Sequence, residues 1–317
     1  MVEYRRLGKT PLIVSELGFG AFAIGGNAHG NSYGHTDDRT SRRAIGEAID
    51  QGCTFFDTAD VYGRGHSESL LGSTLRELKV LDDVVIATKG GGSMDDSGAS
   101  DFSLSRLREA LEASLRRLGR GYVDLYQLHN PTLEDIRNGN IFEVMADLKT
   151  AGLARCVGVS VHTQTEALAC LEHPTCESIQ LVCNLMSSVV PDWGIDKIRQ
   201  QAAAKGVGLI AREPLASGYL ARRHEPDAVY ERGDVRASFS VREQRLRVGL
   251  AAVFHDLKQG PATAAQFAIR HVLDMAEVGT TIVGAKTPEQ VAENFASIQL
   301  PPFDMLYRRA LEADRCS

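Results

Sequence analysis

The stretch "SLSRLREALEASLRRLGRGYVDLYQLH", residues 103–129, holds a helical pattern followed at once by a strand pattern, and this order indicates the type of fold. One apolar stripe at helical spacing is formed by Leu104, Leu107, Leu111, Leu115 and Leu118. Gly119 can end that helix, and the apolar run over 123–129 predicts a buried strand. Helices and buried strands that alternate in this way are typical of a parallel sheet.

The same alternation runs along most of the chain. With 123–129, eight strands are predicted: Glu16–Gly20, Thr54–Asp57, Val84–Lys89, Val123–His129, Arg155–Ser160, Ser178–Cys183, Gly208–Glu213 and Thr280–Gly284. Eight strand–helix units predict an α/β fold of the (β/α)8 TIM barrel type, which needs about 250 residues. The 317 residues therefore accommodate one barrel domain over 1–317.

The alternative architecture is an open, doubly wound sheet. It would place a glycine fingerprint between its first strand and first helix. The segment "GFGAFAIGG", residues 18–26, has glycines near that place, but no helix begins on them and no acid stands at the position that would bind a ribose. The barrel is the favoured prediction.

Two segments lie outside the alternation. The segment "YRRLGKTPLIVS", residues 4–15, has two apolar stretches around Gly8–Pro11 and predicts an N-terminal β-hairpin that could close the bottom of the barrel. The charged run from Leu220 to Val241 predicts a long loop after the strand over 208–213, and loops of this length are usually functional or mobile.

Composition limits the partners. A net charge of -6 and a pI of about 5.9 disfavour nucleic acid. No apolar run approaches the roughly 20 residues that span a bilayer, and the N-terminus lacks an apolar signal core, so a cytoplasmic protein without a membrane partner is predicted. Six cysteines with no CxxC pair disfavour zinc, and buried thiols are favoured over disulfides in this compartment. The oligomeric state is not indicated.

Polar side chains stand where several predicted strands end. Asp57, Lys89 and His129 end three of the strands, and Tyr62 follows Asp57 in the glycine-broken loop "DTADVYGRG", residues 57–65. The carboxyl ends of all barrel strands meet at one rim. Each residue alone could be structural, as a cap, a solvated strand end or a packing residue. Together they predict one site.

The chemistry of these four residues is complementary. The phenol of Tyr62, with an ordinary pKa near 10, can donate a proton. The ammonium of Lys89 would stabilise the resulting phenolate and lower the pKa of Tyr62, and Asp57 would keep Lys89 charged. A neutral His129 could orient a substrate oxygen. This set suits carbonyl reduction, and because side chains supply no hydride, a nicotinamide cofactor is implied.

Two other functions stay open at this point. A Schiff-base aldolase would use Lys89 as its nucleophile, but that chemistry needs a lysine with a lowered pKa, whereas Asp57 would keep it charged. A non-catalytic nucleotide-binding sensor or regulatory subunit would keep the fold and bind the cofactor. Consumption of NADPH with small aldehydes separates these alternatives.

Six motifs carry a resemblance to a known family. "FFDTADVYGRGHSESLLG" (55–72), "VVIATKGG" (84–91) and "YVDLYQLHNP" (122–131) resemble the aspartate–tyrosine, lysine and histidine segments of the aldo-keto reductases, which are NAD(P)(H)-dependent enzymes on a (β/α)8 barrel. "VGVSV" (157–161), "EPLASGYL" (213–220) and "TTIVGAKTPEQVAENFA" (280–296) resemble the cofactor segments of that family. The chain is most similar to bacterial members, and the resemblance implies a catalytic tetrad of Asp57, Tyr62, Lys89 and His129.

The resemblance also implies which residues bind the cofactor. Ser160 and Gln180 would hold the nicotinamide carboxamide, and Arg212 would stack on the ring where relatives often have an aromatic residue. The segment that wraps the pyrophosphate would comprise Pro214, Leu215, Ser217, Gly218 and Leu220. A phosphate would lie near the start of a capped helix, at Gly284, Ala285, Lys286 and Thr287. Glu293 and Asn294 would contact the adenine.

Three positions depart from many relatives. Val161 stands in place of an amide side chain, Gln290 in place of an arginine over the adenine, and Phe22 in place of a tryptophan at the substrate mouth. Lys286 is then the main candidate for a 2′-phosphate contact, so NADP(H) is favoured and NAD(H) is possible. Phe22, Tyr62 and His129 are the predicted substrate contacts of a small carbonyl or alcohol. His29 and His35 are predicted at the surface.

Overall fold

The structure is a computed structural model that describes residues 1–28, 30, 32–92, 100–187, 190, 192, 195, 197–257 and 262–305. Eight parallel strands form a closed barrel in the order β10-β3-β4-β5-β6-β7-β8-β9. They are β3 Leu17–Gly20, β4 Phe55–Asp57, β5 Val85–Gly90, β6 Val123–His129, β7 Ala154–Ser160, β8 Ser178–Val182, β9 Gly208–Arg212 and β10 Val278–Gly284. The predicted barrel is confirmed, and the open sheet is wrong because β10 pairs with β3.

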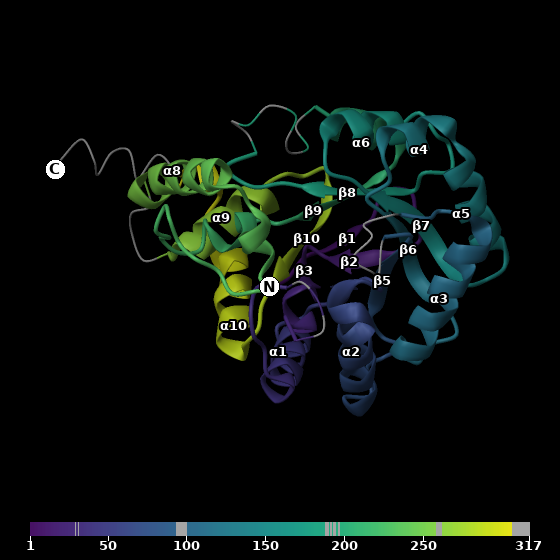
Figure 1. Cartoon of the computed structure of the whole chain (residues 1–317), viewed down its shortest axis with the longest axis horizontal. Helices are drawn as coiled ribbons and strands as arrows, with labels where there is room; N and C mark the ends of the chain where they lie inside the picture. Colours follow the sequence, from purple (N-terminus) through teal and green to yellow (C-terminus); the bar gives the residue numbers. More distant parts are fainter. Residues whose placement is uncertain are drawn as a thin grey trace.

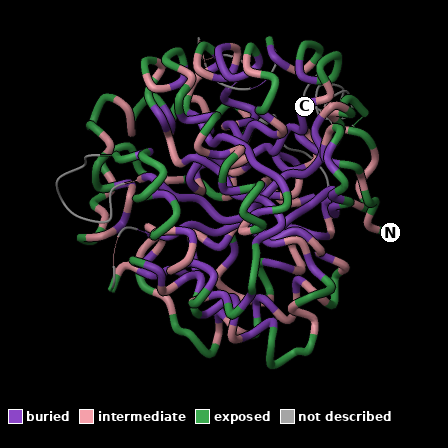
Figure 2. The backbone as a smooth tube through the Cα atoms, turned by 90° about the vertical axis from the view of Figure 1, so that its right-hand side faces the viewer, coloured by how far each residue is buried: buried purple, intermediate pink, exposed green. Residues whose placement is uncertain are grey.

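Helices surround this barrel (Figure 1). They are α1 Asp38–Asp50, α2 His66–Glu77, α3 Leu104–Leu118, α4 Leu133–Asn138, α5 Asn140–Thr150, α6 Gln164–Cys170, α7 Arg199–Lys205, α8 Val241–Leu257, α9 Ala264–Leu273 and α10 Pro288–Ala296. Figure 2 shows buried backbone through the centre of the molecule and exposed backbone at its rim. The strands are buried on both faces, as expected when helices cover a parallel sheet.

Helix α3 follows the predicted apolar stripe with one exception. Leu107, Leu111, Leu115 and Leu118 are buried in the main core, but Leu104 is 37% exposed. Leu104 is the first residue of the helix and lies one turn before the part that packs against the core. Gly119 ends the helix in the left-handed conformation (φ 72°), as its position in the sequence predicts.

The N-terminal hairpin closes the bottom of the barrel. Strands β1 (Tyr4–Arg6) and β2 (Ile13–Ser15) pair antiparallel. The hairpin residues Leu7, Leu12 and Val14 pack in one buried cluster with residues of the barrel strands, namely Phe55, Ala87, Leu125, Cys156, Ile210 and Ile282. A Cβ on Gly8 would lie 2.4 Å from the backbone nitrogen of Gly208, where β9 begins, so this close approach requires glycine.

The predicted long loop is irregular up to a short 3-10 turn over Val235–Ser238, and α8 begins at Val241. A bridge between Ser32 and Asp234 joins this loop to the segment before α1. The cysteines that the structure describes are buried thiols, and Cys316 lies outside the described residues. Over the described ranges, no helix is long and apolar enough to cross a bilayer.

Candidate active site

Adjacent barrel strands bring the four predicted residues to one rim. Asp57 ends β4, Lys89 is the penultimate residue of β5 and His129 ends β6. Tyr62 begins the short turn that follows β4. The next residue, Gly63, has φ 57°, and a Cβ there would lie 2.4 Å from the carbonyl oxygen of Gly25. Glycine therefore lets the Tyr62 loop approach the loop after β3.

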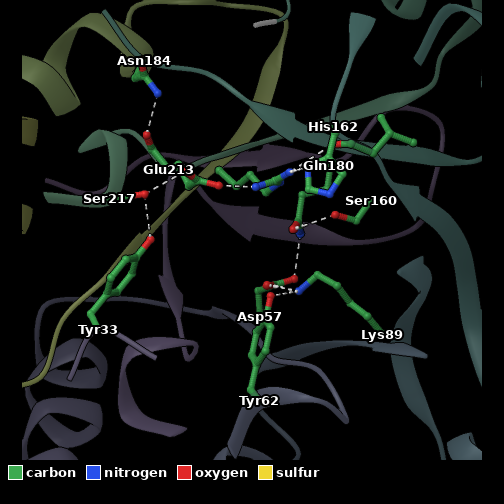
Figure 3. A network of polar contacts seen from close by, with 12 residues as sticks. Tyr33, Asp57, Tyr62, Lys89, Ser160, His162, Gln180, Asn184, Glu213 and Ser217 are labelled. Atoms are coloured by element: carbon green, nitrogen blue, oxygen red, sulfur yellow. Dashed lines mark hydrogen bonds and ion pairs between the residues drawn. The ribbon is translucent and has the colours of Figure 1, made fainter. Parts of the chain in front are cut away.

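Lys89 lies between Asp57 and Tyr62 (Figure 3). Its Nζ donates to Asp57 Oδ1 at 2.5 Å, to the Thr58 carbonyl oxygen at 2.9 Å and to Tyr62 OH at 3.1 Å. These contacts use all three ammonium donors of a fully buried side chain. Burial is the largest single influence and lowers the pKa of Lys89, but the charges and hydrogen bonds of Asp57 and Tyr62 together outweigh it, and the pKa is raised. Lys89 is therefore a fixed cation.

Tyr62 and His129 are both neutral. Lys89 lowers the pKa of Tyr62, as predicted, but burial raises it more, so the pKa of this phenol is raised overall. Burial, reinforced by the charges of Lys89 and Arg212, holds the pKa of His129 well below its ordinary value. The two rings lie 5.8 Å apart, nearly perpendicular. A protonated phenol and a neutral imidazole thus face the same space.

Two glutamines orient Asp57, and the sequence analysis missed one of them. Gln127 Nε2 and Gln180 Nε2 both donate to Asp57 Oδ2, at 3.1 and 2.8 Å. Ser160 Oγ donates to Gln180 Oε1 at 3.4 Å. Gln127 lies two residues before His129 in β6, so strand alternation, which puts both side chains on one face, could have found it.

A cavity of about 850 Å³ opens beside the tetrad. Asp57, Tyr62 and His129 line it, while Lys89 lies beneath. Most other predicted ligand contacts also line it: Phe22, Gln180, Arg212, Pro214, Leu215, Ser217, Gly218, Gly284, Ala285, Lys286, Gln290, Glu293 and Asn294. Its volume is within the range of ligand sites, about 300–1,000 Å³.

Three of the predicted cofactor contacts do not line the cavity. Ser160 is buried behind Gln180. The apolar side chain of Leu220 packs into a hydrophobic cluster with Met186 and Phe267. Thr287 instead caps α10, where its side chain accepts from the backbone N–H of Gln290.

The walls of the cavity fit the parts of a dinucleotide. Glu213, Ala216 and Ser217 have positive φ (56°, 47° and 57°), and left-handed residues in such turns can form anion-binding nests. At the tetrad end, Arg212 Nε is buried without a partner among the described residues. At the other end, Lys286 Nζ donates to the carbonyl oxygens of Tyr33 and His35. The cavity wall therefore holds a mostly buried guanidinium, an ammonium and a turn with three left-handed residues.

An aromatic wall borders the reacting end. The ring of Phe22 lies 4.9 Å from Tyr62 and 5.1 Å from Tyr33, both nearly perpendicular. Tyr33, which was not predicted, donates from its hydroxyl to Ser217 Oγ at 3.3 Å. His35 is exposed, as predicted, whereas His29 lies outside the described residues.

A second buried carboxyl, Asp60, lies behind the tetrad in the same loop. Its Oδ1 has no partner among the described residues, and its backbone N–H donates to the carbonyl oxygen of Lys89 at 3.2 Å. Burial, with a contribution from Glu68, raises the pKa of Asp60 from 3.8 to about 7, against the opposing charges of Arg117 and Arg106. Glu68 itself accepts from Arg117 Nε at 2.6 Å.

Asp60 is expected to make stability depend on pH. Because the pKa of Asp60 is raised on folding, the protonated carboxyl contributes to the free energy of unfolding. This contribution is fully present below about pH 4 and is lost as pH rises through about 7. At about 1.4 kcal/mol per unit, the loss is roughly 4 kcal/mol. Urea unfolding of Asp60→Asn and the wild type should therefore differ increasingly, in favour of the variant, from pH 4 to 7. The exposed Asp50→Asn control should show no such trend; an equal trend there would contradict the assignment.

Comparisons with known proteins agree on one family. Residues 16–311 match the aldo/keto reductase family. The chain is 28% identical over 305 residues to L-galactose dehydrogenase of Arabidopsis thaliana, covering 94% of this chain and 88% of that protein. Several solved structures resemble it, including the following two. Aldo-keto reductase AKR11C1 from Bacillus halodurans, in its holo form, has a TM-score of 0.77 at 26% identity, covering 99% and 96% of the two chains. Glycerol dehydrogenase AKR11B4 from Gluconobacter oxydans has a TM-score of 0.75 at 27% identity, covering 98% and 94%.

Proposed function

The chain belongs to the aldo/keto reductase family and is an NAD(P)H-dependent oxidoreductase, and we propose that Asp57, Tyr62, Lys89 and His129 carry out its carbonyl reduction. The observation that carries this assignment is the contact of one buried ammonium, Lys89, with both Asp57 and Tyr62. When bound, the nicotinamide cofactor supplies hydride to the carbonyl carbon.

The residues of the chain would handle the proton. The neutral phenol of Tyr62 donates its proton to the carbonyl oxygen, and Lys89, 3.1 Å from the phenol oxygen, stabilises the phenolate that remains. The neutral imidazole of His129 donates a hydrogen bond to the same oxygen and orients it. Asp57, held by two glutamines, keeps Lys89 charged and in place.

The two alternative functions predict different results in one assay. Purified protein would be mixed with NADPH or NADH and with aldehydes of equal chain length, glyceraldehyde and propanal, while loss of the reduced cofactor is followed. A reductase consumes cofactor; a sensor binds it without turnover; an aldolase is trapped on Lys89 by borohydride in the presence of a ketone. Because two relatives are named for L-galactose and glycerol, a hydroxylated substrate such as glyceraldehyde is the first choice.

Support for NADP(H) over NAD(H) comes from Lys286. Its ammonium lies half-buried in the cavity. Burial is the main cause of its lowered pKa, and the charges of Arg236 and Arg222 add to this against the opposing charge of Asp234. Gln290 Oε1 accepts from the backbone N–H of Lys286 at 2.8 Å, which fixes the backbone at Lys286. A 2′-phosphate placed here would meet a positioned cation.

Lys286→Met is expected to weaken NADPH binding about tenfold, or about 1.4 kcal/mol, while NADH binding changes little. The reason is that only NADPH carries the 2′-phosphate that the ammonium would contact. Fluorescence titration of both cofactors measures this, with the distant, exposed Lys149→Met as the control. Equal losses for the two cofactors would refute the 2′-phosphate contact.

The cytoplasmic location stays a prediction.

A further inference from the structure

Arg212, the last residue of β9, is held in one orientation at the edge of the cavity. Its Nη2 donates to the Val161 carbonyl oxygen at 3.2 Å and to His162 Nδ1 at 3.1 Å. Its Nη1 donates to Glu213 Oε1. Three partners in different directions prevent the guanidinium from rotating, and the side chain is 15% exposed.

All three contacts are made through the edge of the guanidinium. Its N–H groups lie in the plane of the group, so these hydrogen bonds do not use the faces of the guanidinium, through which it can stack on a flat ring. Nε is also buried and has no partner in the described part of the chain. Arg212 therefore presents an immobile, flat cation to whatever ligand fills this end of the cavity.

The charge of Arg212 acts on the reacting end of the cavity and also on Tyr33 and His162. Arg212 lowers the pKa of both Tyr62 and His129, although burial is the main influence on each. At Tyr33 and His162 the charges of the two residues oppose each other, because Arg212 favours a lower pKa and Glu213 a higher one. Burial is the main influence on both groups, and it raises the pKa of Tyr33 but lowers that of His162. The other nearby cation is Lys89, which pairs with Asp57 at 2.5 Å and has a larger effect than Arg212 on the pKa of His129. Of these two cations, Arg212 is the one that lines the cavity.

We propose that Arg212 makes this site bind reduced nicotinamide cofactor in preference to oxidised cofactor. The proposal rests on the function proposed above, because a ring that delivers hydride to a carbonyl on Tyr62 and His129 must lie beside them. In the reaction the carbonyl carbon gains hydrogen with two electrons from the ring, and the oxygen gains the Tyr62 proton. The C4–H bond of the ring breaks, the ring is left with one positive charge, and solvent returns the proton to Tyr62.

The electrostatic consequence follows from that change of charge. A guanidinium stacks favourably on a neutral dihydropyridine, but against a pyridinium it makes a like-charge contact in a partly desolvated cavity. Glu213 offsets part of this repulsion because it pairs with Arg212. Arg212 therefore favours retention of the reduced form and release of the oxidised form, which supports the direction of carbonyl reduction.

The test compares the dissociation constants of NADPH and NADP⁺, and of NADH and NAD⁺, by calorimetric titration without substrate. Within each pair only the nicotinamide ring differs, so the ratio of the two constants isolates its charge. The wild type should bind the reduced form about tenfold more tightly, or about 1.4 kcal/mol. In Arg212→Met the ratio of the two dissociation constants should be close to one. Arg212→Lys should retain most of the preference for the reduced cofactor, and Glu213→Gln should increase that preference.

The probe 2′-phospho-ADP-ribose, which lacks the nicotinamide, serves as the control for an intact cavity. It should bind the wild type and Arg212→Met with similar affinity. If Arg212→Met no longer binds 2′-phospho-ADP-ribose, its cavity is damaged and the test rests on Glu213→Gln. An unchanged ratio of dissociation constants in Glu213→Gln then overturns the proposal. An equal ratio in all four proteins overturns it while leaving the proposed function in place. Failure of the wild type to bind either dinucleotide overturns both.

Discussion

Tyr62→Phe is expected to lower kcat for carbonyl reduction by about 10²–10⁴-fold, the usual contribution of a general acid. The variant loses only the hydroxyl that touches Lys89 Nζ at 3.1 Å, while the ring keeps its perpendicular contacts with Phe22 and His129. Binding of the cofactor should therefore be almost unchanged. Steady-state kinetics with NADPH and glyceraldehyde, together with fluorescence titration of NADPH, measure the two quantities separately.

Tyr33→Phe is the matched control for this experiment. Tyr33 also lines the cavity and also packs against Phe22, but its hydroxyl donates to Ser217 rather than contacting Lys89. Its loss should leave kcat within a small factor of the wild type. If Tyr62→Phe retained turnover, or if both variants lost it equally, the proton donor would have been assigned wrongly.

Most of the fold could be predicted because the barrel strands are short apolar runs between helical patterns. Short apolar runs of this length, set between helical patterns, are typical of strands buried on both faces. Every predicted strand lies within two residues of the observed one. The ends differ because a strand ends where its last ladder bond forms. For example, Glu213 follows β9 but turns to φ 56° and leaves the sheet. Leu104 was misjudged because helical spacing shows which face a residue is on, not how far the core extends along it.

The candidate site could be predicted where the strand ends carry chemistry, and not where side-chain direction decides. Asp57, Lys89 and His129 stand at strand ends, so the barrel alone brings them together. Gln127 lies inside a strand rather than at its end, and only its alternation with His129 along β6 indicates that its side chain faces the site. Leu220 follows an irregular turn whose residues have positive φ, and no pattern in the sequence indicates that its side chain points into the core.

The buried pair of Asp57 and Lys89 should also dominate the stability of the barrel rim. Asp57→Asn or Lys89→Met alone should each lower the free energy of unfolding by about 3–5 kcal/mol, because each leaves the other charge buried without its partner. The double variant should lose much less than the sum of the two. Chemical denaturation followed by circular dichroism, over all four proteins, gives the coupling free energy directly.

The exposed pair of Arg245 and Asp227 provides the contrast, since its atoms are 2.9 Å apart with side chains 61% and 70% exposed. The same cycle there should give a coupling of about 0–1 kcal/mol. pH separates the two cases further. Because the pKa of Lys89 is raised on folding, its stabilising effect is complete below its unfolded value, about 10.4, and disappears only as pH rises through the folded value. A coupling for Asp57 and Lys89 no larger than that of the exposed pair would mean that water reaches the ammonium, and it would also remove the reason for regarding Lys89 as the fixed cation beside Tyr62.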